Sequence, residues 1–263
     1  MLTAHSGCEG TEMNSIQYIR TGVCACPDAL EVDIRMSDGI LVLDHGKETR
    51  CLPEEKGKDV SRQEHCNEKA AKEAKTATEG ILDIESADID GMNGELTLEE
   101  CLGMLRDTDL YLNADLKEPH LEGAVLAMAE REEFDLGRIV FTGCLGDAAS
   151  MVQRIGRAGV YANPEEIDAA FYKRLSILPM QEKGMYLEDL LQRIHGLGIS
   201  VINVNYRICD ETLLGMCRRN DLRLSLWTVD DPRAAKRLLE PGIREQIENI
   251  TTNRPVYLRE LGW

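Results

Sequence analysis

The segment 29–36 carries ionisable side chains at every second position. Glu31, Asp33 and Arg35 alternate there with apolar residues. Successive side chains of a β-strand point to opposite faces, so the segment predicts a strand with one apolar and one charged face. Because a lone buried charge is costly, we expect the charged row to face water, a cation or an anion.

A hairpin is expected to bring a histidine to this row. Residues 37–39 (Ser-Asp-Gly) are typical of a tight turn, and residues 40–45 are typical of a returning strand. The returning strand would place His45 at about the level of Asp33. Two carboxylates and an imidazole would then meet at one end of the hairpin.

A second strand, predicted over residues 109–117, has a similar polar row that includes Asn113, Asp115 and Lys117. With Glu31 and Asp33, Asp115 would complete a set of three oxygen ligands. Such a set suits a hard divalent cation, Mg²⁺ or Ca²⁺, better than zinc. Lys117 would provide a fixed positive charge against an anion bound to that cation.

Two histidines, His5 and His45, are expected beside this cluster, and imidazoles exchange protons near neutral pH. A cation, a lysine and two histidines together are typical of phosphoester chemistry. The metal and the lysine would neutralise charge on the phosphoryl oxygens, and the imidazoles would supply a base and an acid. Trp227 fits either core packing or a substrate platform.

Strands and helices are expected to alternate regularly along the chain. The predicted strands lie at residues 2–5, 29–36, 109–117, 138–142, 159–162, 199–205, 222–229 and 248–252. Helices are expected from residue 16 to residue 23 and at residues 96–105, 121–130, 148–155, 187–195, 211–218 and 232–239. This alternation predicts a (β/α)₈ TIM barrel in the α/β class, with an open doubly wound sheet as the alternative.

In such a barrel the carboxyl ends of the strands meet at one rim, and chemistry-bearing residues gather at these ends. They are His5, Glu31, Asp33, Asn113, Asp115, Lys117, Asn205 and Trp227. We expect one barrel domain over residues 1–263, interrupted by a charged insertion on the rim at residues 47–94. The part of the insertion up to residue 80 has almost no large apolar side chains.

Composition excludes several classes of partner. Lys and Arg number 30 and Asp and Glu number 47, so the formal net charge is −17. This charge argues against binding to nucleic acid or stable association with anionic membranes.

The sequence has no apolar run of about eighteen residues and no signal-peptide pattern at its start. The nine cysteines are scattered, which favours free thiols in the cytoplasm.

Several motifs resemble those of the glycerophosphodiester phosphodiesterase family, and they occur in the family's order. They are His5-Ser6-Gly7, Asn14-Ser15, Glu31-Val32-Asp33, Asp38-Gly39, His45, residues 96–100, Asn113-Ala114-Asp115-Leu116-Lys117, Trp227-Thr228-Val229 and residues 251–255. The resemblance implies a (β/α)₈ barrel with an extra segment on its rim. It also implies roles for six residues: a divalent cation held by Glu31, Asp33 and Asp115, an acid/base pair formed by His5 and His45, and a phosphate contact from Lys117.

Three positions depart from the family's pattern. Ser6 stands where the family usually has Arg, so one phosphate contact is missing, and Arg35 on the charged row could replace it. Asp115 stands where the family usually has Glu, and its side chain is shorter by one methylene. Gly46 follows His45 where the family commonly has Asp. We therefore expect Ser6, Arg35, Lys117 and Trp227 to contact the substrate.

The sequence thus predicts a phosphoric diester hydrolase that uses a divalent cation and acts on a small-molecule phosphodiester. The substrate class implied by the resemblance is a glycerophosphodiester, which would yield glycerol phosphate and an alcohol. Two alternatives remain open. One is a related phosphodiesterase acting on a lysophospholipid or an inositol lipid. The other is a degenerate barrel that binds a phosphorylated ligand without turnover.

Overall fold

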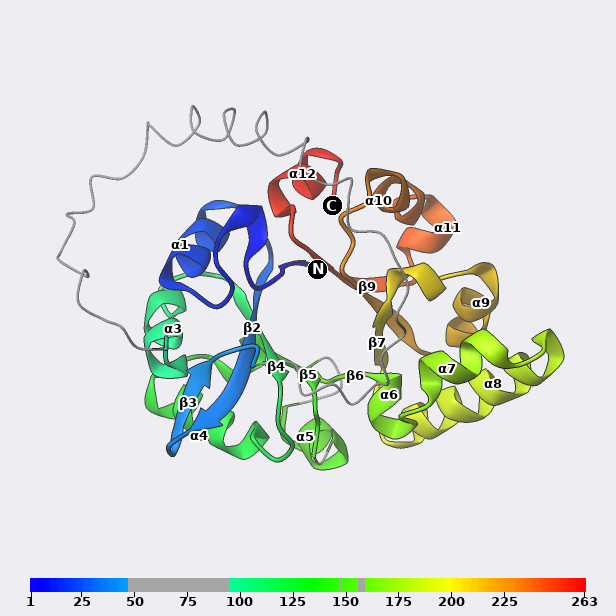
Figure 1. Cartoon of the computed structure of the whole chain (residues 1–263), viewed down its shortest axis with the longest axis horizontal. Coiled ribbons are helices and arrows are strands. Elements are labelled where there is room, and N and C mark those ends of the chain that lie inside the picture. Colours follow the sequence, from blue (N-terminus) through cyan, green and yellow to red (C-terminus); the bar gives the residue numbers. More distant parts are fainter. Residues whose placement is uncertain (47–94, 147, 156–158) are drawn as a thin grey trace. The chain divides into compact units, whose positions relative to one another are not determined.

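Eight parallel strands form a nearly closed barrel with helices around it (Figure 1). They are β1 (Leu2–Ala4), β2 (Ala29–Ser37), β4 (Tyr111–Leu116), β5 (Ile139–Gly143), β6 (Tyr161–Ala162), β7 (Val201–Asn205), β8 (Arg223–Trp227) and β9 (Ile247–Thr252). Their order is β5-β4-β2-β1-β9-β8-β7-β6. A parallel bridge between Phe141 and Val160 joins the two ends of this order. The predicted (β/α)₈ fold is confirmed.

The structure is a computed structural model, and it describes residues 1–46, 95–146, 148–155 and 159–263. The described residues belong to one compact unit. The insertion expected at residues 47–94 lies outside them and stays a prediction. Among the described helices, none has both the length and the hydropathy that a membrane span requires.

Helices connect most of the strands, as the alternation predicted. They are α1 (Ile16–Cys24), α3 (Leu98–Leu105), α4 (Glu122–Arg131), α5 (Ala148–Ile155), α6 (Pro164–Ile167), α7 (Phe171–Ile177), α8 (Met180–Gly196), α9 (Glu211–Arg219), α10 (Pro232–Leu238), α11 (Pro241–Arg244) and α12 (Pro255–Glu260). The short helices α6, α7, α11 and α12 were not expected from the sequence. Helix α8 begins seven residues before its predicted start, because its first turns are largely exposed and lack the apolar stripe on which the prediction depends.

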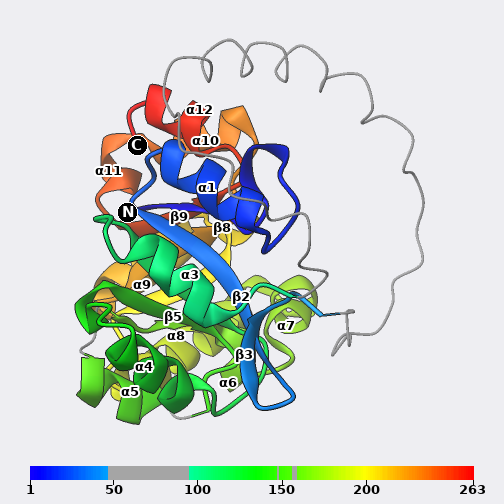
Figure 2. The ribbon, with the colours of Figure 1, turned by 90° about the vertical axis from the view of Figure 1, so that its left-hand side faces the viewer.

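The hairpin formed by β2 and β3 (Ile40–Leu43) stands at the edge of the barrel mouth (Figure 2). Its two turn residues, Asp38 and Gly39, have φ values of 47° and 80°. Positive φ at both central positions is the geometry that a tight two-residue hairpin requires. The backbone N–H of Asp44 donates to the carbonyl of Asp33 at 3.0 Å. The hairpin therefore returns the chain to the level of Asp33, as predicted.

The barrel interior contains a chain of hydrogen-bonded polar side chains. Thr3 Oγ1 donates to Asn249 Oδ1 at 2.7 Å, and Asn249 Nδ2 donates to Ser225 Oγ at 3.0 Å. Thr142 Oγ1 donates to Asn113 Oδ1 at 3.1 Å. Buried polar groups are costly unless they are paired, so this network favours one register of the strands.

Thr97 forms a capping box at the start of α3. Its Oγ1 accepts from the N–H of Glu100 at 3.2 Å, and Glu100 Oε2 accepts from the N–H of Thr97 at 2.9 Å. We expect Thr97→Ala to lower the free energy of unfolding by about 1 kcal/mol, because this cap is lost. Urea denaturation followed by circular dichroism measures the change. Thr97→Ser keeps the hydroxyl and serves as the control, and equal stability of the Ala variant and the wild type would contradict the prediction.

Candidate functional site

A cavity of about 370 Å³ opens at the carboxyl ends of the strands. Its described lining comes from β1, β2, β4, β5, β7, β8 and the segments that follow them, and from the residues after β6. The lining consists of His5, Glu31, Asp33, His45, Asp115, Leu116, Lys117, Thr142, Gly143, Cys144, Asn163, Glu165, Glu166, Asn203, Trp227 and Thr228. The cavity thus gathers most of the residues that the sequence analysis selected.

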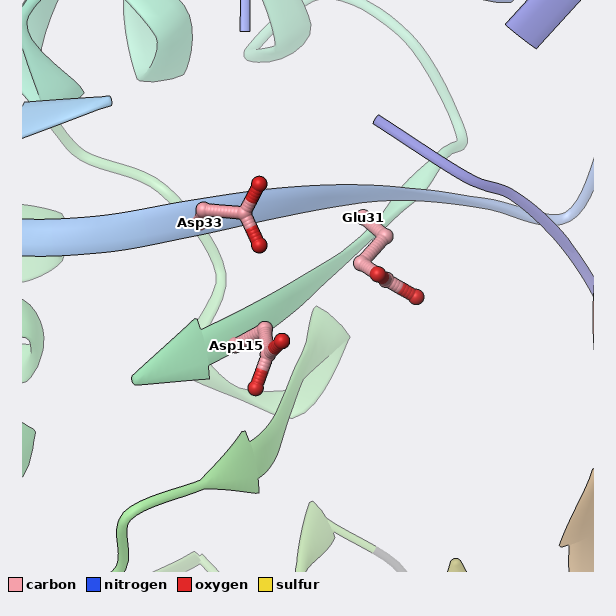
Figure 3. A group of neighbouring side chains, drawn as sticks. All are labelled: Glu31, Asp33 and Asp115. Atoms are coloured by element: carbon pink, nitrogen blue, oxygen red, sulfur yellow. The ribbon is translucent and has the colours of Figure 1, made fainter. Parts of the chain in front are cut away.

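Three carboxylates converge at the mouth of the barrel (Figure 3). Glu31 and Asp33 project from β2, and Asp115 projects from β4, where it is the register partner of Asp33. One carboxylate oxygen from each residue lies within 4.8 Å of the others. The set contains oxygen donors only and is close enough for one hard divalent cation such as Mg²⁺ or Ca²⁺. These residues therefore fit the predicted cation site.

Lys117 lies between two of these carboxylates. Its Nζ is 2.7 Å from Asp33 Oδ1 and 2.5 Å from Asp115 Oδ2. Burial by itself would lower the pKa of Lys117, but Asp115 and Asp33 outweigh burial and raise this pKa above its ordinary value. Burial would likewise raise the pKa of Asp33, but Lys117 lowers it to about 2. This ion pair therefore keeps both groups charged near neutral pH.

Glu31 is the carboxylate without a lysine partner. It is 8% exposed, and burial, followed by the charges of Asp115 and Asp33, raises its pKa well above the ordinary value. Asn113 Nδ2 donates to Glu31 Oε2 at a long 3.4 Å. A bound divalent cation would reverse the cost of ionising Glu31, because it places positive charge where three negative charges meet. The electrostatics of the cluster thus fit a cation as well as the donor set does.

Two residues hold Asp33 in place by hydrogen bonds. Ser6 Oγ donates to Asp33 Oδ2 at 2.9 Å, and Asn14 Nδ2 donates to the same oxygen at 2.7 Å. The backbone N–H of Asp33 donates in turn to Asn14 Oδ1 at 3.1 Å. Ser6 is 1% exposed, so its hydroxyl orients a carboxylate. It does not line the cavity as the expected substrate contact would.

Both predicted histidines lie against carboxylates. His5 Nε2 is 3.8 Å from Glu31 Oε1, and His45 Nδ1 is 3.4 Å from Asp33 Oδ2. Burial lowers the pKa of His5, and Asp33 opposes this shift only in part. His45 is half exposed. Two imidazoles of different exposure therefore face the same cluster of acids.

Comparison with known proteins gives a structural likeness without a detectable sequence match. No protein-family profile and no curated protein match the sequence. A phosphodiesterase from Oleispira antarctica, solved with the product sn-glycerol-3-phosphate, has a TM-score of 0.61 and 14% identity, covering 99% of this chain and 95% of its own. A proposed glycerophosphoryl diester phosphodiesterase from Agrobacterium tumefaciens has a TM-score of 0.63 and 16% identity, covering 99% and 96%. One from Silicibacter pomeroyi has a TM-score of 0.60 and 19% identity, covering 99% and 92%.

The chain has the fold of the glycerophosphodiester phosphodiesterases. Its likeness to these proteins extends over essentially its whole length. The fold that the resemblance implied is therefore confirmed.

Arg35 does not take the place that the sequence analysis gave it. Its Nη1 lies 3.4 Å from Glu118 Oε1, and its Nη2 donates to the carbonyl of His45 at 3.3 Å. The guanidinium is thus directed to Glu118 and the hairpin end, and Arg35 is absent from the cavity lining. Among the described residues, Lys117 is the only Lys or Arg that lines the cavity. The expected replacement for the missing arginine is not formed.

Of the other two predicted positions, Trp227 reaches the cavity and Asn205 does not. Trp227 lines the cavity, as does Asn203, two residues before Asn205 on β7. Asn205 itself does not line it, and its Oδ1 accepts from the N–H of Arg207, at the start of a short 3₁₀ helix. On β7 the side chain that reaches the cavity is therefore Asn203, two residues before the predicted Asn205.

Three residues at or beside the site were not expected from the sequence. Asn14 had no role assigned within the Asn14-Ser15 motif, and in the structure Ser15 caps α1 while Asn14 holds Asp33. Glu165 and Glu166 follow β6 and line the cavity. Their position just after a strand was an available signal, but β6 has only two residues, too few for a periodic pattern to reveal.

Asn14 supports a direct test of the cation site. Its φ is 53°, so Asn14→Gly removes both hydrogen bonds to Asp33 without backbone strain. We expect this change to weaken Mg²⁺ or Ca²⁺ binding by about 10–100-fold, because a residue that orients a ligand is lost. Isothermal titration calorimetry measures the affinity. Gln17→Ala, on the exposed side of α1, is the control, and wild-type affinity in Asn14→Gly would contradict the assignment.

Proposed function

We propose that the protein hydrolyses glycerophosphodiesters to glycerol phosphate and an alcohol. The observation that carries this proposal is the convergence of three carboxylates, Lys117 and two histidines in one cavity of this fold. The Oleispira antarctica phosphodiesterase, which was solved with sn-glycerol-3-phosphate, supports the same class of ligand. The whole-length structural likeness adds to the argument.

In this proposal Glu31, Asp33 and Asp115 hold a divalent cation, Mg²⁺ or Ca²⁺. A bound cation of this kind neutralises charge on phosphoryl oxygens. Lys117 contributes a second positive charge, since it stays protonated beside Asp33 and Asp115. Ser6 and Asn14 fix the orientation of Asp33. The cavity thereby gains positive charge at the place where the phosphodiester binds.

His5 and His45 carry the protons in this proposal. One imidazole accepts the proton of the attacking hydroxyl, and the other donates a proton to the departing alcohol. Burial lowers the pKa of His5, which favours its neutral, proton-accepting form near neutral pH. Water or a substrate hydroxyl serves as the nucleophile.

The two alternatives are binding without turnover and action on a lysophospholipid or inositol lipid. Binding without turnover is favoured by Ser6, which leaves the cavity without a second described cationic side chain, but a pure binder has no need of two proton carriers. Action on a lysophospholipid or inositol lipid requires an apolar entrance. The described lining has only Leu116 and Trp227 as large apolar residues, which favours a small polar diester.

The seven described cysteines are unpaired, which supports the proposed cytoplasmic location.

The histidine pair can be tested by substitution. We expect His5→Ala and His45→Ala each to lower kcat on a glycerophosphodiester by about 10²–10⁴-fold, the usual effect of a positioned proton carrier. Binding of sn-glycerol-3-phosphate should fall much less. His195→Ala, an exposed position on α8, is the matched control. Near-normal turnover in either site variant would assign that histidine a structural role.

The metal dependence can be tested by removal. We expect a chelator to abolish turnover, and added Mg²⁺, Ca²⁺ or Mn²⁺ to restore it, because the three carboxylates repel one another and an anionic substrate without a cation. A coupled assay for released glycerol phosphate measures the rate. Full activity in excess chelator would contradict the proposed cation.

A further inference from the structure

A second cavity, of about 500 Å³, opens at the end of the barrel opposite the carboxylate cluster. It lies at the amino ends of the strands, where Tyr111 begins β4 and Tyr161 begins β6. In Figure 2 the N-terminus lies at this end, away from the β2–β3 hairpin. The described lining shares no residue with the cavity at the mouth, and it consists of Met1, Pro27, Asp28, Asp109, Leu110, Tyr111, Val140, Tyr161 and Glu248.

Val140 and Tyr161 face the barrel interior at this end. They precede Thr142 and Asn163 by two positions, and both of these residues line the cavity at the mouth. Residues two positions apart in an extended chain share a face. Val140 and Tyr161 also pack in one small cluster with Val201. They therefore form the inner wall of the second cavity, at the bottom of the barrel.

The hydroxyl of Tyr161 is without a partner at this inner wall. Tyr161 is only 2% exposed, and its Oη forms no hydrogen bond with any described residue. Burial raises the pKa of Tyr161, so the group stays a neutral hydroxyl that can both donate and accept. By contrast, the fully buried Tyr18 donates to the carbonyl oxygens of Ala4 and Glu31. A buried tyrosine hydroxyl usually has a partner, and here the cavity is the place from which one can come.

Two of the three carboxylates of this cavity are already neutralised. Arg259 forms an ion pair with Asp28, and Arg223 forms one with Glu248. Neither arginine lines the cavity. The amino group of Met1 donates to the carbonyl oxygen of Glu248 at 2.5 Å. The charge of Asp28 and Glu248 is therefore largely offset within the protein.

Asp109 is the carboxylate that remains without a counter-ion. It is exposed, and no described residue forms an ion pair or a hydrogen bond with its side chain. Tyr111, which is 38% exposed, lines the same cavity, and an aromatic face and a carboxylate both attract an organic cation. A metal ion is not favoured here, because within the described chain the only acidic group at metal-binding spacing is the cluster at the barrel mouth.

We propose that this cavity binds a small aromatic amine that carries a hydroxyl group at its far end, a class represented by tyramine. The ammonium would lie at the exposed end, beside Asp109 and Tyr111. The aromatic body would pack on Leu110 and Val140, and the ligand's hydroxyl would pair with the buried hydroxyl of Tyr161. Charge stays near water in this orientation, and the neutral hydroxyl enters the buried end. The site does not depend on the proposed function.

The test uses tyramine and phenethylamine, which differ only in the phenol hydroxyl. We expect the wild type to bind tyramine about 2–10-fold more tightly than phenethylamine, the effect of one neutral hydrogen bond, and Tyr161→Phe to bind the two amines equally. Asp109→Asn should weaken both amines by about 2–5-fold, as for an exposed ion pair. Isothermal titration calorimetry measures the affinities.

Two matched variants serve as controls and should keep wild-type affinities. Tyr257→Phe removes a hydroxyl on α12 that lies outside both cavity linings, and Asp107→Asn removes an exposed charge next to the cavity but outside its lining. Tyr161→Phe should also keep the wild-type melting temperature, because the hydroxyl that it removes forms no hydrogen bond in the free protein. A lower melting temperature would show that the hydroxyl already has a partner and would overturn the site.

The other outcomes are equally decisive. Absence of saturable tyramine binding would overturn the proposal, as would a preference for tyramine that persists in Tyr161→Phe, since the amine would then bind elsewhere. Tyrosol replaces the ammonium of tyramine by a neutral hydroxyl, so it should bind more weakly than tyramine, and equal binding would overturn the role of charge. Phosphodiester turnover does not enter these measurements, so failure of the proposed function would leave this test unchanged.

Discussion

Repulsion among the carboxylates of Glu31, Asp33 and Asp115 is the constraint that the neighbouring side chains at the barrel mouth must offset. Their oxygens lie within 4.8 Å of one another, so three full negative charges there are unfavourable without a cation. Lys117 offsets part of the repulsion through its contacts with Asp33 and Asp115. Glu31 has no such partner, and its pKa is raised. Lys117 therefore neutralises only part of the negative charge of the cluster, and a bound cation would neutralise more of it.

The geometry of this cluster depends on the register of β2 and β4. Glu31 pairs with Asn113 and Asp33 with Asp115 across the two strands. A slip of one residue would turn Asp115 to the outer face, where the apolar residues pack. The buried network of Thr142, Asn113 and Glu31 disfavours such a slip, because it would leave polar groups unpaired. Polar contacts inside the barrel thus position the acids at its rim.

Acidic side chains line two parts of the same cavity. Glu31, Asp33 and Asp115 lie with Lys117 in the part formed by β2 and β4, and Glu165 and Glu166 follow β6. In a (β/α)₈ barrel each strand delivers its own loop to a shared rim, so two binding tasks can be placed on different strands. Ser6 donates its hydrogen bond to Asp33 and adds no charge to the cavity.

The sequence by itself determined the barrel and the core of the candidate site. Alternation with a period of two identified Glu31 and Asp33, and the tight turn at Asp38 and Gly39 placed His45 beside them, because these features depend on residues close together in the chain. Only the tertiary structure decided the positions of Asn14, Arg35 and Glu165. Asn14 reaches Asp33 across 19 positions, and Arg35 turns to Glu118 across 83. Glu165 joins the cavity after a strand of two residues. Such contacts depend on how distant segments pack and on which rotamer each side chain adopts, and no local pattern encodes either.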